Sequence, residues 1–200
     1  MQMSKREQNK KANREAILVA ARDVFSQLGF GAATVRDIVR ASGLAIGSFY
    51  NYFNDKDEAF AALVEAIVVP LARDLKAARA AAGTPQAFIG EPYRLVADFA
   101  RTDSANAALI VKNQTLFRQT FYLTPIRTTV QTDLETDLGR WMEEGRLRRH
   151  DPVLMADAML ALGIDLVVQT ALDPASAPGR VAFLVDLFMA RLAPAARPSA

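Results

Sequence analysis

The chain lacks residues that whole classes of chemistry require. Its 200 residues include no cysteine, which excludes disulfides and thiol nucleophiles and fits a reducing compartment. The single histidine, His150, means that a transition-metal site would have to be built almost wholly from carboxylates, and we expect none. The sequence contains no phosphate-binding glycine loop, dinucleotide fingerprint or serine nucleophile elbow. We therefore expect that the protein binds no cofactor and is not an enzyme, although its composition does not exclude catalysis by carboxylates.

No segment has the pattern of a signal peptide or a membrane span. Arg22 and Asp23 interrupt the first apolar run, and the most apolar later stretch, residues 153–172, contains Asp157 and Asp165. We interpret that stretch as a buried helix. We expect a cytoplasmic protein without a membrane partner.

The positive charge is concentrated at the beginning of the chain. The net charge is +2, and residues 1–60 contain nine Lys/Arg against seven Asp/Glu, which leaves fifteen of each sign for the rest. Five of those nine cations lie between Lys5 and Arg14. This cluster indicates either a basic arm or a solvated, frayed terminus.

Helical periodicity dominates the sequence, and no alternating run is long enough for a strand, so we predict an all-α fold. We expect a first helix over about residues 9–27 and two short helices between Thr34 and Phe53. A long helix follows from a cap at Asn54-Asp55 to about residue 82, with a kink or a missing backbone bond at Pro70. Further helices are expected over 92–101, 104–122, 125–148, 152–172 and 178–192.

The two short helices and the turn at Gly43 match a helix-turn-helix. Gly47 would let the second short helix approach a DNA groove closely. The hydroxyls of Ser48, Tyr50 and Tyr52 and the ammonium of Lys56 can donate to phosphates, although core packing is an equal alternative for Tyr52. The positions around Gly47 that are least committed to packing are Ala45, Ile46, Ser48, Tyr50, Asn51 and Tyr52.

The stretch 16–63 resembles the DNA-binding domain of the TetR family of bacterial transcriptional regulators, with FSQLGFGAATVRDIVRASGLAIGSFYNYFNDKDEAFAALV at its centre. The resemblance implies a regulator, most often a repressor, that binds double-stranded DNA as a homodimer and responds to a small-molecule effector. It implies a domain of residues 1–54 with an arm and the helix-turn-helix, and an effector-binding and dimerisation domain of residues 55–193. Residues 194–200 are expected to be a disordered tail.

The resemblance also implies roles for individual residues. Thr34 and Ser48 would bind phosphates together with Tyr50 and Tyr52, Arg36 would reach a base edge or the backbone, and Lys56 would anchor the first turn of the fourth helix. Ala45 and Ile46 depart from the polar or basic residues that are frequent in the family. We therefore expect apolar contact with thymine methyl groups and a larger share of shape readout at those two positions.

An effector pocket is predicted in the larger half of the chain. Gln114 and Arg118 interrupt an apolar stripe of the helix 104–122 and, being four residues apart, can meet one ligand. Alternatively, Arg118 reaches solvent or pairs with Asp98 or Asp165. The aromatic residues nearby can equally be core. The predicted set is Tyr93, Phe99, Gln114, Phe117, Arg118, Phe121, Tyr122, Trp141 and Asp165.

The last two helices are apolar around most of their girth, so each needs two burial partners. One partner is the chain's own domain, and we predict that the other is the same surface of a second subunit. The residues predicted for this interface are Met155, Met159, Leu162, Leu166, Phe183, Leu184, Leu187 and Phe188. A constitutive DNA-binding protein without an effector remains the alternative function.

Overall fold

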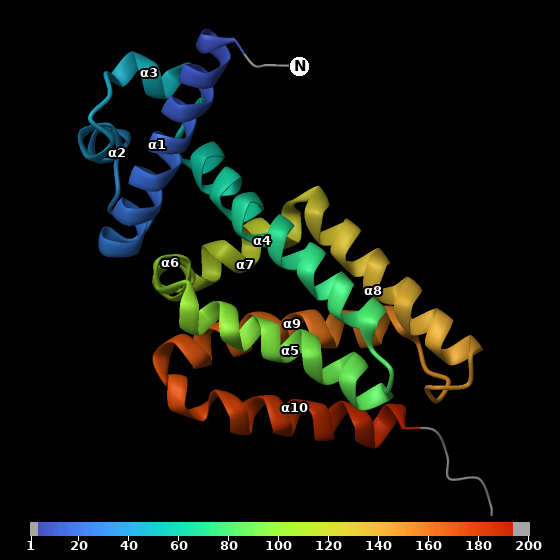
Figure 1. Ribbon diagram of the computed structural model, residues 1–200. Helices are drawn as coiled ribbons and strands as arrows, with labels where there is room; N and C mark the ends of the chain where they lie inside the picture. The colour runs from blue at the N-terminus through green and yellow to red at the C-terminus, as the bar shows by residue number, and fades with distance from the viewer. Residues whose placement is uncertain (1–3, 194–200) are drawn as a thin grey trace, which may run out of the picture.

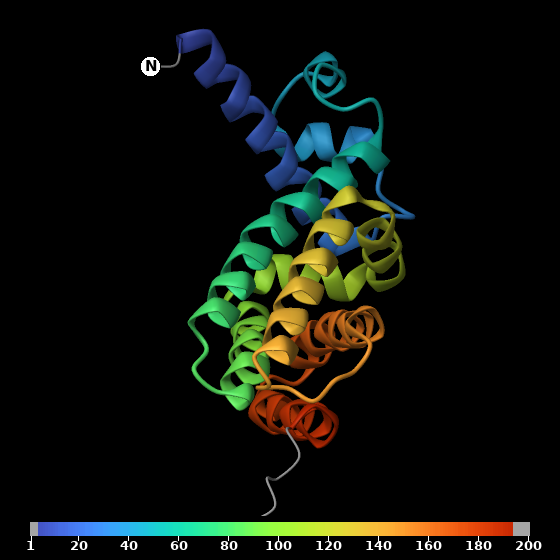
Figure 2. The ribbon, with the colours of Figure 1, turned by 90° about the vertical axis from the view of Figure 1, so that its right-hand side faces the viewer.

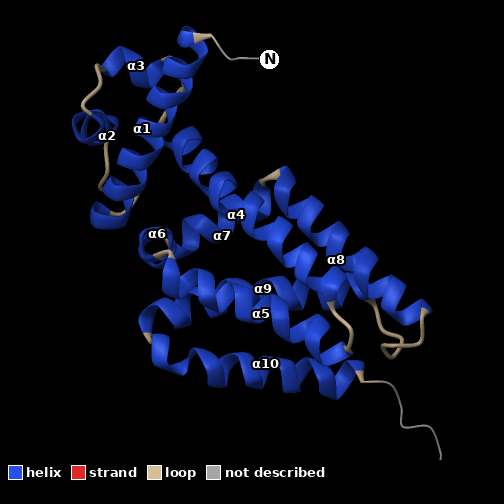
Figure 3. Cartoon of the chain, viewed as in Figure 1, coloured by secondary structure: helices blue, strands red, loops and turns tan. Residues whose placement is uncertain are grey.

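The computed structural model describes residues 4–193, and within that range the chain forms helices and no strand (Figure 3). The all-α prediction is confirmed, while the tail predicted over residues 194–200 lies outside the described residues. The elements are α1 (Lys5–Leu28), α2 (Val35–Ser42), α3 (Ile46–Tyr50), α4 (Lys56–Ala81), α5 (Pro85–Thr102), α6 (Ser104–Lys112), α7 (Gln114–Leu123), α8 (Pro125–Glu143), α9 (Pro152–Leu172), the 3-10 turn η1 (Pro174–Ser176) and α10 (Ala177–Leu192).

Helices α1 to α3 form a group at one end of the molecule, which we call the head (Figure 1). Helix α1 begins at Lys5 rather than near Asn9, because Ser4 and Glu7 form a capping box: the Glu7 amide donates to Ser4 Oγ, and the Ser4 amide donates to Glu7 Oε2 at 2.8 Å. These hydrogen bonds hold the pKa of the Glu7 carboxyl below its usual range. The basic cluster is therefore the start of a helix and not an extended arm.

The helix-turn-helix is built by local signals that the sequence predicts. Thr34 and Asp37 form a second capping box at the start of α2. Gly43 follows α2 with φ of 69°, a left-handed conformation that glycine adopts at little cost. Ile38 and Phe49 are fully buried in the core beneath α2 and α3.

Helix α4 leads from the head into the remaining helices, as both views show (Figures 1 and 2). It begins after the predicted cap, Asp55, whose carboxylate accepts from the Glu58 amide, and it continues through Pro70 to Ala81. Its first turns pack against the head. Its later turns pack against α5, α7 and α8.

Besides the start of α1, three further helix boundaries differ clearly from the prediction. Helix α5 begins at Pro85 and not at Pro92, because the Thr84 side chain caps it and Pro85 occupies its first turn. The predicted helix 104–122 is two helices, α6 and α7, with a break at Asn113. Helix α8 ends at Glu143, and Gly145 follows with φ of 70°.

The break at Asn113 has a structural cause. The Asn113 side chain is buried, and its amide nitrogen donates to the Phe25 carbonyl at 3.0 Å and to the Leu109 carbonyl at 2.9 Å. Its amide oxygen accepts from the Phe30 backbone N–H at 2.7 Å. One side chain therefore joins the end of α1 to the junction of α6 and α7.

Helix α9 agrees only partly with its interpretation as a buried helix. By length and composition it could cross a membrane, because its most apolar window of 18 residues has a mean hydropathy of 1.7. Of that window, 33% is buried inside this chain. It packs between α5, α6 and α8. A helix of this kind is common in the cores of proteins that do not span membranes, so it does not indicate a membrane protein.

Replacing Asn113 by alanine should destabilise the protein. The two carbonyls also accept backbone N–H groups, from Gly29 and from Asn113 itself, so the group left without a partner is the Phe30 N–H. We expect Asn113→Ala to lower the free energy of unfolding by about 2 kcal/mol. Urea denaturation measures it, with Asn106→Ala in α6 as the matched control. Equal losses in the two variants would contradict the role of Asn113.

Candidate DNA-binding surface and effector cavity

The residues predicted to face DNA lie together on α3 and its flanking residues. Ala45, Ile46, Gly47, Tyr50 and Asn51 are exposed, with Ile46 at 48% and Tyr50 at 55% of their full accessibility. Ser48 and Tyr52 are half-buried. An exposed isoleucine beside an exposed tyrosine on so short a helix suits an interface better than a surface that faces only water.

Gly47 has no packing reason inside the chain. A Cβ atom added there would meet no other atom within 4 Å, in contrast with Gly90 of α5, where it would lie 3.3 Å from Val185. The space in front of Gly47 is open. The close-approach interpretation of this glycine therefore refers to a partner outside the chain.

Tyr50 and Arg36 present free polar groups on this surface. The Tyr50 ring packs edge-on against Phe49, and its hydroxyl forms no hydrogen bond with any residue in 4–193. Arg36 is exposed on α2 and likewise has no ion pair or hydrogen bond to the described part of the chain. Both groups can donate to phosphate oxygens without losing an internal partner.

Two more of the predicted phosphate ligands, Thr34 and Lys56, have internal partners. The Thr34 hydroxyl donates to Asp37 Oδ2 at 2.6 Å, and the hydrogen bonds from Thr34 hold the pKa of the Asp37 carboxyl below its usual range. The Lys56 ammonium donates to the Phe30 and Ala33 carbonyls at 2.8 and 2.9 Å. Lys56 thus fastens the start of α4 to the turn between α1 and α2, which leaves one N–H for any other acceptor.

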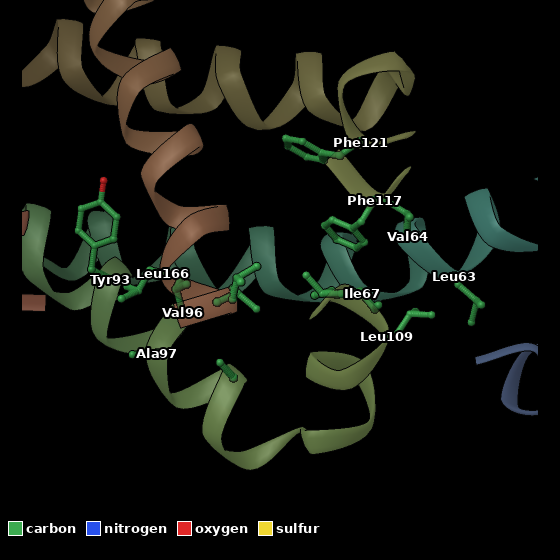
Figure 4. Close-up of a cluster of buried hydrophobic side chains, with 14 of the residues drawn as sticks. Leu63, Val64, Ile67, Tyr93, Val96, Ala97, Leu109, Phe117, Phe121 and Leu166 are labelled. Atoms are coloured by element: carbon green, nitrogen blue, oxygen red, sulfur yellow. The ribbon is translucent and has the colours of Figure 1, made fainter. Parts of the chain in front are cut away.

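An apolar cavity of about 120 Å³ lies in the larger half of the molecule, between α4, α5, α6, α7, α8 and α9. Tyr93, Phe99, Phe117 and Phe121 line it, as predicted for a pocket. Figure 4 shows Ile67, Phe117 and Phe121 grouped together, with Tyr93 at the far end of the cluster. The Tyr93 hydroxyl donates to the Met159 carbonyl at 3.1 Å, and burial raises the pKa of Tyr93.

The other residues predicted for the pocket do not reach the cavity. Gln114, Arg118 and Tyr122 lie on the exposed side of α7, whereas Phe117 and Phe121 on its other side are buried. This placement agrees with the alternative in which Arg118 reaches solvent. Trp141 is buried against Phe88, with ring centroids 4.6 Å apart. Asp165 is exposed on α9.

The buried arginine of this domain is Arg79, which the sequence prediction missed. Arg79 is 5% exposed, lines the cavity, and donates from Nε to Asp137 Oδ2 at 2.8 Å. It continues the row Ile67, Leu71 and Leu75 at intervals of four residues on α4, and all four side chains line the cavity. That spacing is the signal that could have identified it.

The residues predicted for a dimer interface divide into two groups. Phe183 and Leu187 of α10 are 66% and 47% exposed, and Met155 and Leu162 of α9 are half-buried. The other four are buried inside the chain and are core residues: Met159, Leu166, Leu184 and Phe188. Packing within the chain therefore accounts for one apolar face of each helix and leaves Phe183 and Leu187 uncovered.

Comparison with known proteins agrees with these features. The model of the bacterial regulatory proteins of the tetR family matches residues 17–63. The HTH-type transcriptional repressor Rv1474c of Mycobacterium tuberculosis is 42% identical over 52 residues, which are 26% of this chain and only 28% of that protein's length. The HTH-type transcriptional repressor AcnR of Corynebacterium efficiens is 28% identical over 84% of this chain and 86% of its own length.

Two solved structures share the fold over most of the chain. The fatty acid degradation regulator FadR of Bacillus halodurans superposes with a TM-score of 0.72 over 86% of this chain and 94% of its own, at 17% identity. FadR of Bacillus subtilis, solved in complex with stearoyl-CoA, gives a TM-score of 0.62 over 86% and 97%, at 18% identity. The helix-turn-helix, the family match over it and the shared all-α fold lead to one conclusion: residues 17–63 form a DNA-binding domain of the TetR family of bacterial regulatory proteins, within an all-α fold that solved regulators share over most of the chain.

Proposed function

We propose that this protein is a cytoplasmic repressor that binds a roughly palindromic DNA operator as a homodimer and is released when a small molecule occupies the cavity. The observation that supports it most is the pairing of an exposed, open-faced α3 with an apolar cavity, joined by α4 and Asn113. Two repressors among the relatives support the direction of regulation. A two-fold dimer would place its half-sites about one DNA turn, roughly 34–36 Å, or a multiple apart.

The release step rests on the coupling between cavity and head. A ligand that fits the cavity better in one placement of α4 and α7 shifts the head toward that placement, and the shift is limited by the ligand's differential affinity for the two states. Ile110 and Phe117 line the cavity on either side of Asn113 in sequence, and Asn113 contacts the head directly. A constitutive DNA-binding protein would show no such response.

Selection of bound fragments from the source genome tests the proposal. We expect recovery of two-fold symmetric sites, and binding to them that is weakened by at least one compound of a small-molecule panel. Recovery of no enriched site would overturn the regulator. Symmetric sites with no response to any ligand would favour the constitutive alternative.

Replacing Tyr50 by phenylalanine removes one hydroxyl from the proposed DNA surface and little else. We expect about a tenfold loss of operator affinity at fixed salt, because a hydrogen bond to a charged phosphate is lost. Fluorescence anisotropy measures it. Tyr122→Phe, an exposed tyrosine of α7, should bind as the unchanged protein does. Equal affinities for the two variants would remove Tyr50 from the interface.

Lys56 provides a test that separates internal support from phosphate binding. We expect Lys56→Met to lower the free energy of unfolding by about 1–3 kcal/mol, because the Phe30 and Ala33 carbonyls lose a charged donor. The slope of log affinity against log salt should stay unchanged. Arg36→Met, which has no internal partner to lose, should make that slope shallower by about 1. A similar change in slope for Lys56→Met would assign its ammonium to the phosphates instead.

Phe183 tests the proposed dimer. Placing a carboxylate in an apolar interface leaves a charge without a partner, so Phe183→Glu should convert the dimer to a monomer at micromolar concentration. Sedimentation equilibrium measures the mass. Leu123→Glu on α7, where the leucine is 78% exposed, should leave the dimer intact. A dimer that survives Phe183→Glu would place the interface elsewhere.

A further inference from the structure

The cavity combines an apolar wall with one charged group whose donors are not all used. Among the described residues that line it, Arg79 is charged, Tyr93 is the other with a polar side chain, and the rest are apolar. The Tyr93 hydroxyl already donates to the Met159 carbonyl. Any polar recognition inside the cavity therefore falls to Arg79.

The guanidinium of Arg79 is held by one edge only. Its Nε donates to Asp137, whereas Nη1 and Nη2 form no hydrogen bond with any residue between 4 and 193. Arg79 is 5% exposed, but its terminal nitrogens are not among the fully buried polar atoms that lack a partner, so they border accessible space. A planar guanidinium with free terminal nitrogens matches a carboxylate in charge and geometry.

The charge around Arg79 also favours an anion. Asp137 is shared, since Arg140 Nη2 approaches its Oδ1 at 3.3 Å. One turn before Arg79 on α4, Lys76 pairs with Asp133 at 2.7 Å. Three cations, Lys76, Arg79 and Arg140, therefore meet two carboxylates, Asp133 and Asp137, where α4 packs against α8. The net charge of this group of five side chains is +1.

The shape of the cavity indicates how a ligand would lie in it. The cavity has a volume of about 120 Å³, and Ile67, Leu71 and Leu75 of α4 and Phe117 of α7 form part of its wall. An apolar chain would lie along these residues, with its polar end at Arg79.

We propose that the effector is an amphipathic monocarboxylate whose carboxylate is bound by the terminal nitrogens of Arg79 and whose apolar part lies against the cavity wall. This inference rests on the proposed function, because it identifies the class of ligand that the cavity takes. Asp137 orients the guanidinium, and the apolar wall favours an apolar tail. A neutral alcohol of equal length gains the same burial but leaves the arginine without an anion.

Calorimetric titration of the protein with decanoate and decanol tests the proposal. We expect decanoate to bind roughly tenfold or more tightly than decanol, since hydrogen bonds to a charged group are lost in the alcohol. Decanol binding as tightly as decanoate would overturn the assignment.

Two double variants separate the role of Arg79 from a general loss of charge. Arg79→Met/Asp137→Asn removes the buried pair without leaving a lone charge, and it should reduce decanoate affinity to that of decanol with decanol binding unchanged. Lys76→Met/Asp133→Asn makes the same chemical change one turn away and should bind decanoate as the unchanged protein does. Cooperative thermal unfolding confirms that each variant is folded.

Operator binding measured on the same preparations distinguishes the two proposals. Operator affinity that falls on addition of decanoate, and no longer does so in Arg79→Met/Asp137→Asn, supports both. A protein that binds its operator but not decanoate overturns the ligand class and leaves the regulator standing. Decanoate binding without any operator would overturn the proposed function and retain the site. Decanoate affinity unchanged in Arg79→Met/Asp137→Asn would show that Arg79 does not bind the carboxylate.

Discussion

The structure depends on how one residue, Phe30, is held between the two halves of the molecule. Its N–H donates to Asn113 at the junction of α6 and α7, and its carbonyl accepts from the Lys56 ammonium on α4. Its ring packs against Phe25 and Phe60, with the Lys56 ammonium 4.4 Å from its centre. Phe30 lies in the turn that precedes α2. The orientation of the helix-turn-helix is therefore set by residues of the larger half.

Helix α4 with Lys56, and α7 with Asn113, are two direct connections between the cavity and the head. Helix α4 extends from Lys56, beside Phe30, to Arg79 at the cavity, roughly 35 Å at 1.5 Å per residue. The second connection passes from Phe117 in the cavity wall to Asn113 four residues earlier. Because both connections end on the same turn, a displacement of α4 relative to α7 must either move that turn or break a buried hydrogen bond. Breaking it costs free energy that a ligand would have to supply.

The local signals in the sequence predict much of this architecture, and the contacts between distant segments explain what they miss. The capping residue Thr34, the left-handed Gly43 and the cap Asp55 act within a few residues, so the helix-turn-helix and the start of α4 could be predicted. The break at Asn113 could not, because its partners Phe25 and Phe30 are 88 and 83 residues away in sequence. Helix α7 begins directly after this break, and its Phe117 and Phe121 line the cavity, whereas Gln114 and Arg118, also predicted for the pocket, lie on its exposed side.

The low polarity of the candidate base-reading positions bears on how the connection between cavity and head would control DNA binding. Ala45 and Ile46 are exposed but cannot form side-chain hydrogen bonds to bases, so we infer that affinity depends on phosphate contacts such as those of Tyr50 and Arg36. Phosphate contacts from two subunits are made together only when the heads have the spacing and angle of the DNA backbone. A protein that reads shape in this way loses several contacts at once when its heads move. The apolar side chains of Ala45 and Ile46, which weaken direct base readout, would therefore make control through the placement of the heads effective. The hydrogen bonds of Phe30 with Asn113 and Lys56 are where that control would act.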